Sequence, residues 1–408
     1  MLTRNPWRGV AGLPASVWIV CATTFVNRAG TMVVPFMVLY VTRHLGVRPA
    51  LAGMALTVYG LGGLVSGPIA GRLCDRLGPF AVLRGGLVLS GLILLAFPLA
   101  SRFGTFLAIT FVWSLVAESV RPATLAAVTS VVRPDQRKVA VAVNRLGINL
   151  GMSVGPAVGG FLATVSFPLL FVVDGASALA AGLVLTALLA WRPLARLAAG
   201  RLGEDPLAPD DPRGTSVLRD PRAVVFLTGI FLMGVVFYQH EGAMPLFLVR
   251  DLHYRESFYG LLFVVNTVLI VLVEVPLNLA MAGWSHRWTM VLGAVLYALG
   301  FGSMAVLHSA PGLLLSAVVW TFGEMIAIPA SSAYASDIAP PGRTGQYAGA
   351  YASMFSLAIL VGPWAGTIAL EQFGGTALWL GILVVGLLSA AVLSLTDQRL
   401  EHPDDSCH

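Results

Sequence analysis

The most constraining feature of this sequence is a pattern of six residues that occurs twice, each time within apolar regions. The first copy consists of Trp113, Pro122, Pro134, Gly155, Pro156 and Gly159, and the second of Trp320, Pro329, Pro341, Gly362, Pro363 and Gly366. The two members of every pair lie 207 positions apart, which is about half of the 408 residues. The chain is therefore predicted to consist of two similar halves joined in line.

The composition excludes a soluble protein. Hydrophobic residues make up 57% of the chain, charged residues only 11%, and the mean hydropathy is +0.83. A soluble domain averages roughly 25% charged residues, and a soluble chain of this length would divide into domains that each need a polar surface. Since the charge present cannot cover such surfaces, we expect most of the chain to lie in a lipid bilayer.

Twelve apolar stretches have about 20 residues each, the length that spans about 30 Å of hydrocarbon. They cover 16–40, 51–73, 82–100, 106–131, 139–165, 169–190, 223–249, 258–280, 288–307, 312–338, 345–368 and 376–396. The sequence thus predicts an all-α integral membrane protein with four parts: a first bundle at 1–190, a cytoplasmic linker at 191–222, a second bundle at 223–396 and a tail at 397–408. Internal repeats in such a chain are typical of transporters.

The basic residues predict the orientation. Of the 25 Lys and Arg residues, 17 lie in segments on the side of the N-terminus and five in segments on the other side. Because cytoplasmic segments carry the excess of basic residues, both termini are expected in the cytoplasm. The same excess explains the net charge of +5, so the charge gives no reason to expect nucleic acid as a partner.

The sequence favours neither an enzyme nor a metalloprotein. Its three cysteines, Cys21, Cys74 and Cys407, are scattered, which predicts no disulfide framework and no metal site. It contains no G-x-x-x-x-G-K-[ST] phosphate loop and no Ser/His/Asp constellation. We therefore expect no cofactor.

Two motifs carry a resemblance to a known family. The segment GRLCDRLGPFAVLRGG, from Gly71 to Gly86, resembles the cytoplasmic loop signature of the major facilitator superfamily. The stretch NRLGINLGMSVGPAVGG, from Asn144 to Gly160, resembles the antiporter signature of the proton-linked drug exporters in that superfamily, and a lactococcal multidrug exporter is similar. The resemblance covers the whole chain and implies twelve transmembrane helices in two pseudo-symmetric bundles of six. Its motif residues are Gly71, Asp75, Arg76, Gly78, Gly151, Gly155, Pro156, Gly159 and Gly160.

The resemblance implies a conformational gate on the cytoplasmic side. Asp75 is expected to hold the halves together in the outward-facing state by pairing with Arg and a helix N-terminus of the other half; the alternative is a solvated loop charge. Asn144 stands where the lactococcal relative has an Asp. Arg145 beside it is expected to reach the surface or to pair with Asp75. Gly71, Arg76 and Gly78 complete the predicted gate.

Span 5 has a glycine at every fourth position from 147 to 159. This spacing gives a flat helix face that allows close packing, and Pro156 is expected to kink the helix. The resemblance implies that the bend closes the inner pathway and favours exchange. Ordinary packing of small residues is the alternative.

Ionisable residues at membrane depth are costly and are functional candidates for that reason. The candidates for proton and substrate coupling lie on spans 1, 4, 7 and 10, which line the central cavity in the superfamily; they are Arg28, Glu118, Arg121, Glu241 and Glu324. Glu324 is the first choice for a proton carrier, because its apolar neighbours favour the protonated form. The arginines are expected as counter-ions. Permanent structural ion pairs are the alternative for all five residues.

Other residues complete the predicted site. The residues expected to line the substrate cavity are Asn27, Tyr238, His240, Trp320 and Phe322, with ordinary packing as the alternative. Asp174 is expected as a charge at the outer end of span 6, and Glu274 in span 8 as a structural hydrogen-bonding residue.

The function favoured by the sequence is proton-coupled export of amphipathic small molecules by alternating access, with the proton gradient as energy source. The chain is expected to act as a monomer in a bacterial cytoplasmic membrane. A proton-coupled symporter that imports a nutrient or peptide remains an alternative, favoured by the cavity arginines. A lipid translocase is another, and a non-transporting receptor is disfavoured because no folded domain lies outside the membrane.

Overall fold

The structure is a computed structural model, and it describes residues 12–133, 136–191, 217–281, 283–340 and 343–396. The described residues of the first half form helices only: α1 Ala15–Gly30, α2 Val33–Arg43, α3 Pro49–Ala52, α4 Met54–Leu77, α5 Pro79–Ala96, η2 Phe97–Leu99, α6 Phe103–Ser130, α7 Arg137–Val165 and α8 Phe167–Trp191. Most of the predicted linker, the predicted tail with Cys407, and Pro134 and Pro341 of the repeat lie outside the described residues.

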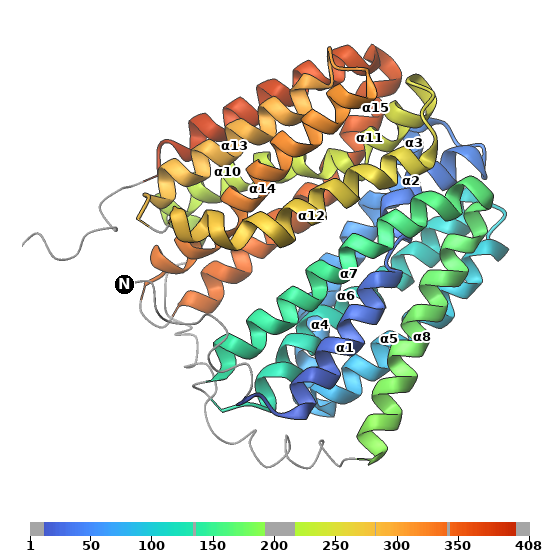
Figure 1. Cartoon of the computed structure of the whole chain (residues 1–408), viewed down its shortest axis with the longest axis vertical. Coiled ribbons are helices and arrows are strands. Elements are labelled where there is room, and N and C mark those ends of the chain that lie inside the picture. Colours follow the sequence, from blue (N-terminus) through green and yellow to red (C-terminus); the bar gives the residue numbers. More distant parts are fainter. Residues whose placement is uncertain (1–11, 134–135, 192–216, 282, 341–342, 397–408) are drawn as a thin grey trace, which may run out of the picture.

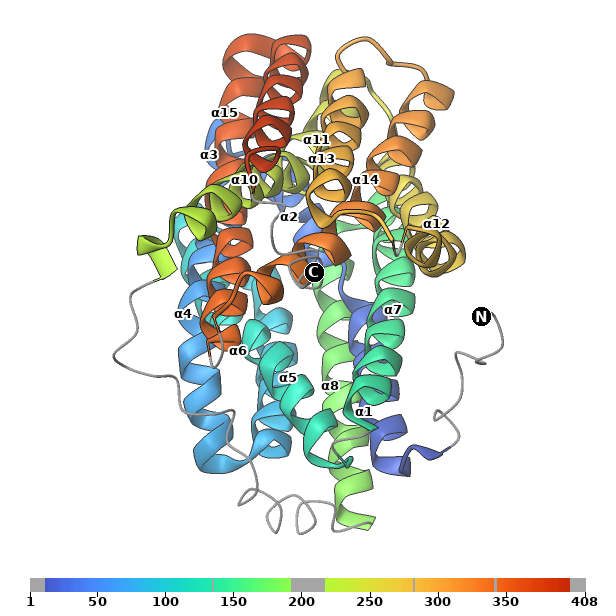
Figure 2. The ribbon, with the colours of Figure 1, turned by 90° about the vertical axis from the view of Figure 1, so that its left-hand side faces the viewer.

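The second half repeats this all-helical arrangement. Its elements are η4 Val217–Arg219, α10 Pro221–Phe237, η5 Tyr238–His240, α11 Ala243–Leu246, η6 Phe247–Asp251, α12 Glu256–Ala280, α13 His286–Ser303, α14 Ala310–Asp337 and α15 Thr344–Leu393. Figures 1 and 2 show two bundles side by side, the blue-to-green first half and the yellow-to-red second half. The two-bundle organisation predicted from the repeat agrees with this arrangement.

Ten helical stretches in the described part of the chain are long and apolar enough to cross a membrane. The predicted number of twelve is not confirmed by this count, for two reasons. Helix α13 is not among the ten, and α15 enters as one stretch of 50 residues. As one straight helix, α15 would be about 75 Å long, but Gly374 interrupts it with a φ of 80°, which lets the chain reverse there.

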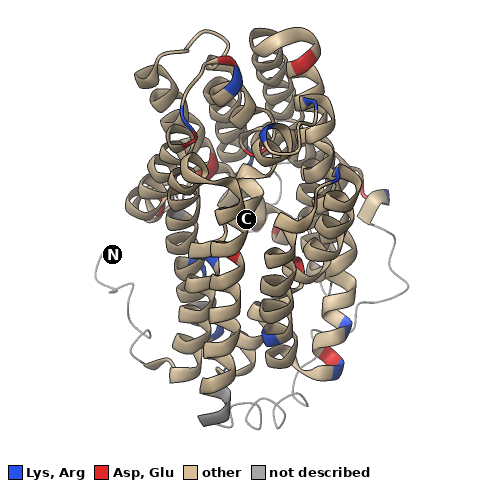
Figure 3. Ribbon diagram, turned by 90° about the vertical axis from the view of Figure 1, so that its right-hand side faces the viewer, with Lys and Arg blue, Asp and Glu red and all other residues tan. Residues whose placement is uncertain are grey.

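The outer surface of the helices is apolar. Large hydrophobic side chains such as Leu89, Phe161, Leu183 and Leu272 are exposed, and Figure 3 shows how few charged residues the ribbon carries. Small residues allow the helices inside to approach closely. For example, a Cβ on Gly300 of α13 would lie 2.6 Å from the backbone nitrogen of Trp320 on α14.

The first stretch of each half is a broken helix, although the sequence predicted it as continuous. Helix α1 ends at Gly30 and α2 begins at Val33, whereas α10 ends at Phe237 and regular α-helix returns only at Ala243. Gly30 and Phe237 are separated by the same 207 positions as the repeated motif. The internal symmetry therefore extends to the backbone, and both breaks lie beside the central cavity described below.

The two halves are closed against each other at one end of the bundle and, outside the contact between α7 and α12, diverge at the other. At the end where α2 finishes, Arg43 forms an ion pair with Glu256 of α12, and Glu371 of α15 accepts a hydrogen bond from the Ala50 backbone N–H. We call this the Arg43 end, and the opposite end, where α1 begins, the Ala15 end. Figure 1 shows the halves splayed apart at the Ala15 end.

Glycines along α4 and α15 show where this separation begins. A Cβ on Gly60 would lie 2.9 Å from the Ile359 side chain. Seven residues further along α4, a Cβ on Gly67 would meet no described atom within 4 Å, and the same holds for Gly349 on α15. The pathway between the halves is therefore closed at the Arg43 end and open at the Ala15 end.

Candidate functional site

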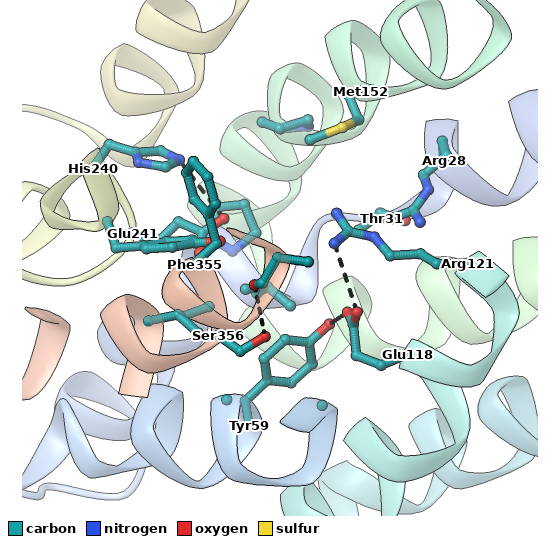
Figure 4. Close-up of a pocket in the computed structure, with 18 of the residues that line it drawn as sticks. Arg28, Thr31, Tyr59, Glu118, Arg121, Met152, His240, Glu241, Phe355 and Ser356 are labelled. Atoms are coloured by element: carbon teal, nitrogen blue, oxygen red, sulfur yellow. Dashed lines mark hydrogen bonds and ion pairs between the residues drawn. The ribbon is translucent and has the colours of Figure 1, made fainter. Parts of the chain in front are cut away.

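A cavity of about 480 Å³ lies between the two halves. It is lined by parts of α1, α2, α4, α6 and α7 from the first half, and of η5, α12, α14 and α15 from the second. Figure 4 shows Arg28, Arg121, Glu118 and Tyr59 on one side, with His240 and Glu241 across from them. Of the residues predicted for coupling, the structure brings Arg28, Glu118, Arg121 and Glu241 together here, with Tyr238 and His240 from the predicted lining.

The first-half wall is built around Glu118. Tyr59 donates a hydrogen bond of 2.5 Å to Oε1 of Glu118, and Nη1 of Arg121, one helical turn further along α6, lies 3.7 Å from Oε2. The Arg121 side chain is 62% exposed and projects into the cavity. Arg28 also faces the cavity, and among the described residues its guanidinium makes no hydrogen bond and has no carboxylate within 4 Å.

The second-half wall follows the break in span 7. His240 places Nδ1 2.5 Å from the carbonyl oxygen of Phe237 and Nε2 3.7 Å from Oε1 of Glu241. The contact to a carbonyl requires the proton on Nδ1. Nε2 and the nearby carboxyl are then repulsive unless one of them also carries a proton. Oε2 of Glu241 is buried and has no hydrogen-bond partner among the described residues, so this pair is suited to hold or release a proton.

Glu324 lies outside the main cavity, in a neighbouring pocket of about 70 Å³. Asn266 of α12 donates a hydrogen bond of 2.9 Å to Oε2 of Glu324, and no Lys or Arg in the described chain lies within 4 Å of it. Met152, His240 and Phe263 line both pockets. They form a thin partition, so Glu324 is adjacent to the cavity without belonging to it.

The other residues predicted for the cavity are dispersed. Trp320 is 2% exposed and lines the Glu324 pocket, whereas Asn27 lines a third pocket of about 40 Å³ behind Arg28. Phe322 lines none of these three pockets. Spans 4 and 10 are related by the repeat, yet Glu118 faces the cavity and Glu324 a side pocket, because their positions differ by 206 residues, one short of the repeat offset.

The predicted gate residues lie at the open Ala15 end. Gly78 has a φ of +84° and ends α4, a conformation that favours glycine. Asp75 and Arg76 are exposed, and within the described chain neither forms an ion pair. Gly71 has open space around it. The loop is therefore not engaged with the other half in this open conformation.

Arg145 forms a different pair from the one expected. Its Nη2 lies 3.4 Å from Oε1 of Glu274, so the partner belongs to α12 of the second half and is not Asp75. Glu274 was expected to form a structural hydrogen bond to a neighbour, and it accepts one from Arg145. Asn144 beside Arg145 is buried, and its Oδ1 has no partner among the described residues.

The glycines of the antiporter-like motif pack against the break in span 1. A Cβ on Gly155 would lie 2.4 Å from the carbonyl oxygen of Thr31, and one on Gly159 would lie 2.8 Å from Cβ of Met32. Gly160 instead faces α12, where a Cβ would lie 3.0 Å from Cα of Gly260. The flat face therefore lets α7 contact both the broken helix and the other half, next to Pro156 in the cavity wall.

Asp174 lies deeper in its helix than predicted. It is buried within α8, and its Oδ2 accepts hydrogen bonds of 3.1 and 3.2 Å from the backbone N–H groups of Met32 and Val33. These are donors that the start of α2 leaves without helical partners. The available signal was the isolated charge in an otherwise apolar span, which by itself indicates a specific partner.

An internally repeated helical membrane fold with a polar cavity between its halves defines the class of secondary transporters. A sequence model described as Major Facilitator Superfamily matches residues 20–254 and 240–406. The chain therefore belongs to the Major Facilitator Superfamily. It is a multi-pass membrane transporter and not an enzyme, as the sequence predicted.

Several bacterial relatives share nearly the whole chain. An uncharacterized MFS-type transporter, YttB of Bacillus subtilis, is 24% identical, covering 95% of this chain and 97% of its own. A Na(+), Li(+), K(+)/H(+) antiporter of Planococcus maritimus is 24% identical (92% and 95%), and the quinolone resistance protein NorA of Staphylococcus aureus is 23% identical (81% and 84%). These relatives agree with the predicted exporter branch.

Solved structures show the same fold. A POT family transporter, crystallised with a thioalcohol-conjugated peptide, superposes with a TM-score of 0.79. The match covers 97% of this chain and 99% of the other, at 15% sequence identity. At this level of identity the similarity establishes the fold alone.

Proposed function

We propose that this protein exports amphipathic small molecules in exchange for protons, by alternating access of the central cavity. The observation that carries the proposal is the cavity itself: two carboxylates, Glu118 and Glu241, face each other from different halves of a repeated transporter fold. Carboxylates at membrane depth are suited to carry protons. We further propose that the chain has twelve spans and acts as a monomer in the bacterial cytoplasmic membrane, with both termini in the cytoplasm. The proton gradient supplies the energy, and no cofactor is needed.

Each carboxylate has a partner that a proton would release. Protonation of Glu118 would weaken its attraction to Arg121 and leave that side chain free to bind elsewhere. Protonation of Glu241 would remove the repulsion between its carboxylate and Nε2 of His240. Glu324 forms no ion pair within the described chain and accepts a hydrogen bond from Asn266, so a proton there removes a negative charge that has no directly bound cation. In this scheme Glu324 takes up the proton, and the partition formed by Met152, His240 and Phe263 transmits its change of protonation to the cavity.

Export by antiport is supported by the glycine face of α7 and by two of the relatives, an ion/proton antiporter and a quinolone resistance protein. A second candidate is proton-coupled import of a small charged nutrient. The observation that favours it is the pair of arginines in the cavity, Arg28 and Arg121, because a fixed positive charge disfavours the lipophilic cations that multidrug exporters commonly carry.

The experiment is a proton-coupling measurement in proteoliposomes with a pH-sensitive dye inside. Lipophilic cations, zwitterions and peptides are added in turn to the wild type and to Glu324→Gln. Asp337→Asn is the control, because it also neutralises a carboxylate, and Asp337 is 52% exposed and lines none of the three pockets.

Substrate-dependent proton movement opposite to the substrate, lost in Glu324→Gln and kept in the control, is the expected result. Proton movement in the same direction as the substrate would assign the protein to the symporters. Substrate flux without any proton movement would leave the carboxylates as structural ion pairs and favour uniport or lipid translocation.

A further inference from the structure

The first-half wall of the cavity carries more positive charge than its own carboxylate can neutralise. Both oxygens of Glu118 are engaged, Oε1 by the Tyr59 hydroxyl and Oε2 by Arg121 at 3.7 Å. Arg28 lines the same wall, and no acceptor in the described chain pairs with it. The second carboxylate near Arg28 is Asp174, which lies behind it in the small third pocket, and its Oδ2 is already bound by the backbone N–H groups of Met32 and Val33.

A guanidinium cannot lose its proton in a protein, so it must be paired or hydrated. Arg121 is paired with Glu118, whereas Arg28 has no ion-pair or hydrogen-bond partner in the described chain and faces the open cavity. A molecule that enters the cavity displaces water from these groups. It must then supply acceptors of its own, or the unpaired charge of Arg28 opposes its binding.

The opposite wall has the complementary character. Oε2 of Glu241 is buried and has no partner in the described chain, and Tyr238, Phe263 and Phe355 line the same cavity as Glu241. An unpaired carboxylate in a cavity lined by aromatic side chains favours an amine or another cation. The cavity is therefore bipolar, with its basic wall in the first half and its acidic, aromatic wall in the second (Figure 4).

We infer that the substrate is an amphipathic zwitterion, whose carboxylate binds Arg28 and Arg121 and whose amine faces Glu241. This inference rests on the proposed transport function and specifies its substrate class. The volume of about 480 Å³ is that of a site for a drug-sized molecule. The planar guanidinium groups match the two oxygens of a carboxylate. A substrate that bridges the walls contacts both halves, which is what a molecule that controls their relative movement must do.

The first test is binding to the purified wild-type protein in detergent, measured by calorimetry with matched pairs of ligands. Each pair consists of a zwitterion and its methyl ester, which keeps the amine and the apolar body but lacks the anionic charge. The panel contains a fluoroquinolone, a hydrophobic dipeptide and an aromatic amino acid, with tetraphenylphosphonium as a purely cationic probe.

We expect at least one zwitterion to bind about 10-fold or more tightly than its ester, the range for loss of a charge-assisted contact. Esters that bind as tightly as their parent acids would overturn the inference. So would binding of tetraphenylphosphonium alone, or no binding by any carboxylate-bearing member of the panel.

Substitutions test which residues cause the preference for the acid over its ester. In Arg28→Gln and Arg121→Gln the preference for acid over ester should fall about 10-fold, while the ester still binds. Arg102→Gln is the control, because Arg102 is exposed at the start of α6 and lines none of the three pockets. Arg28→Gln is the more decisive variant, since it removes no ion pair of the described chain. A preference that survives in a folded, monodisperse Arg28→Gln would refute the assigned contact.

The proton assay separates the two levels of inference. Proton antiport with esters or lipophilic cations, but not with zwitterions, would overturn the substrate class and leave the proposed export intact. Zwitterion binding that depends on Arg28, without proton movement, would support the substrate class and refute proton coupling.

Discussion

Different side chains bind the backbone at the two broken helices. In the first half, the Asp174 carboxylate of α8 accepts hydrogen bonds from two backbone N–H groups at the start of α2. In the second half, the side-chain amide of Gln239 donates to the carbonyl oxygens of Val235 and Gly362, at 3.1 and 2.8 Å. The repeat therefore preserves where the helix breaks and leaves the stabilising group free to change. Because the first break depends on a buried charged acceptor, it should lose more stability than the second when its stabilising side chain is removed.

Asp174→Ala should have the largest effect on stability. It leaves two buried N–H groups without an acceptor, at about 1–3 kcal/mol each. Asp174→Asn keeps a carbonyl oxygen and should recover much of the loss. Gln239→Ala should cost less, because carbonyl oxygens tolerate an unmade bond better than N–H groups do. Thermal unfolding in detergent compares the three variants, and equal losses in Asp174→Ala and Gln239→Ala would contradict the proposed asymmetry.

The glycines that press on the two breaks provide a matched second test. Gly155 and Gly362 correspond in the repeat, yet a Cβ would lie 2.4 Å from the Thr31 carbonyl oxygen in one case and 3.1 Å from that of Val235 in the other. Gly155→Ala should therefore destabilise by about 1–3 kcal/mol, the cost of overpacking, and Gly362→Ala by clearly less. Side-by-side melting curves check the order; equal losses would show that the breaks are equally constrained, and the reverse order that the second break is the tighter one.

Thiol labelling can compare the two ends of the α4/α15 interface. In a variant whose native cysteines are replaced, Gly349→Cys should react readily with a soluble maleimide, because nothing described lies within 4 Å of that position. Gly60→Cys would be a poor control, since a Cβ there collides with Ile359 at 2.9 Å. Thr57→Cys is better, because Thr57 contacts the Leu360 carbonyl within the closed interface. Equal labelling rates at 57 and 349 would argue against closure at the Arg43 end.

The smallest effect is expected at the Ala15 end of the α7/α12 contact. Arg145 is 55% exposed in its pair with Glu274, and exposed pairs contribute about 0–1 kcal/mol. Glu274→Gln should therefore change the melting temperature little. A large loss of stability would mean that this pair, and not only the contacts at the Arg43 end, holds the halves together.

Much of the fold followed from the sequence, because bilayer thickness fixes helix length and the repeat fixes the number of halves. The break at Gly30 did not, since Thr31 and Met32 fit a continuous apolar helix and only the distant Asp174 explains the interruption. The site residues were predicted from the spans on which they lie, and Glu118 and Glu241 do line the cavity. It failed to separate Glu324 and Phe322 from that group, because span number does not give the direction of a side chain around its helix. Arg145 found its partner in the other half, which no local pattern encodes.

Tyr259 of α12 shows how the closed end could open at little cost. Its hydroxyl, which has one hydrogen to donate, lies 3.1 Å from the Pro35 carbonyl oxygen in the first half and 2.8 Å from the His240 carbonyl oxygen in its own half. When the halves separate there, the hydrogen can stay with His240 and no donor is stranded. The Tyr259 hydroxyl thus keeps an acceptor whether or not the halves are in contact. This makes the closed end easy to open and equally easy to close again.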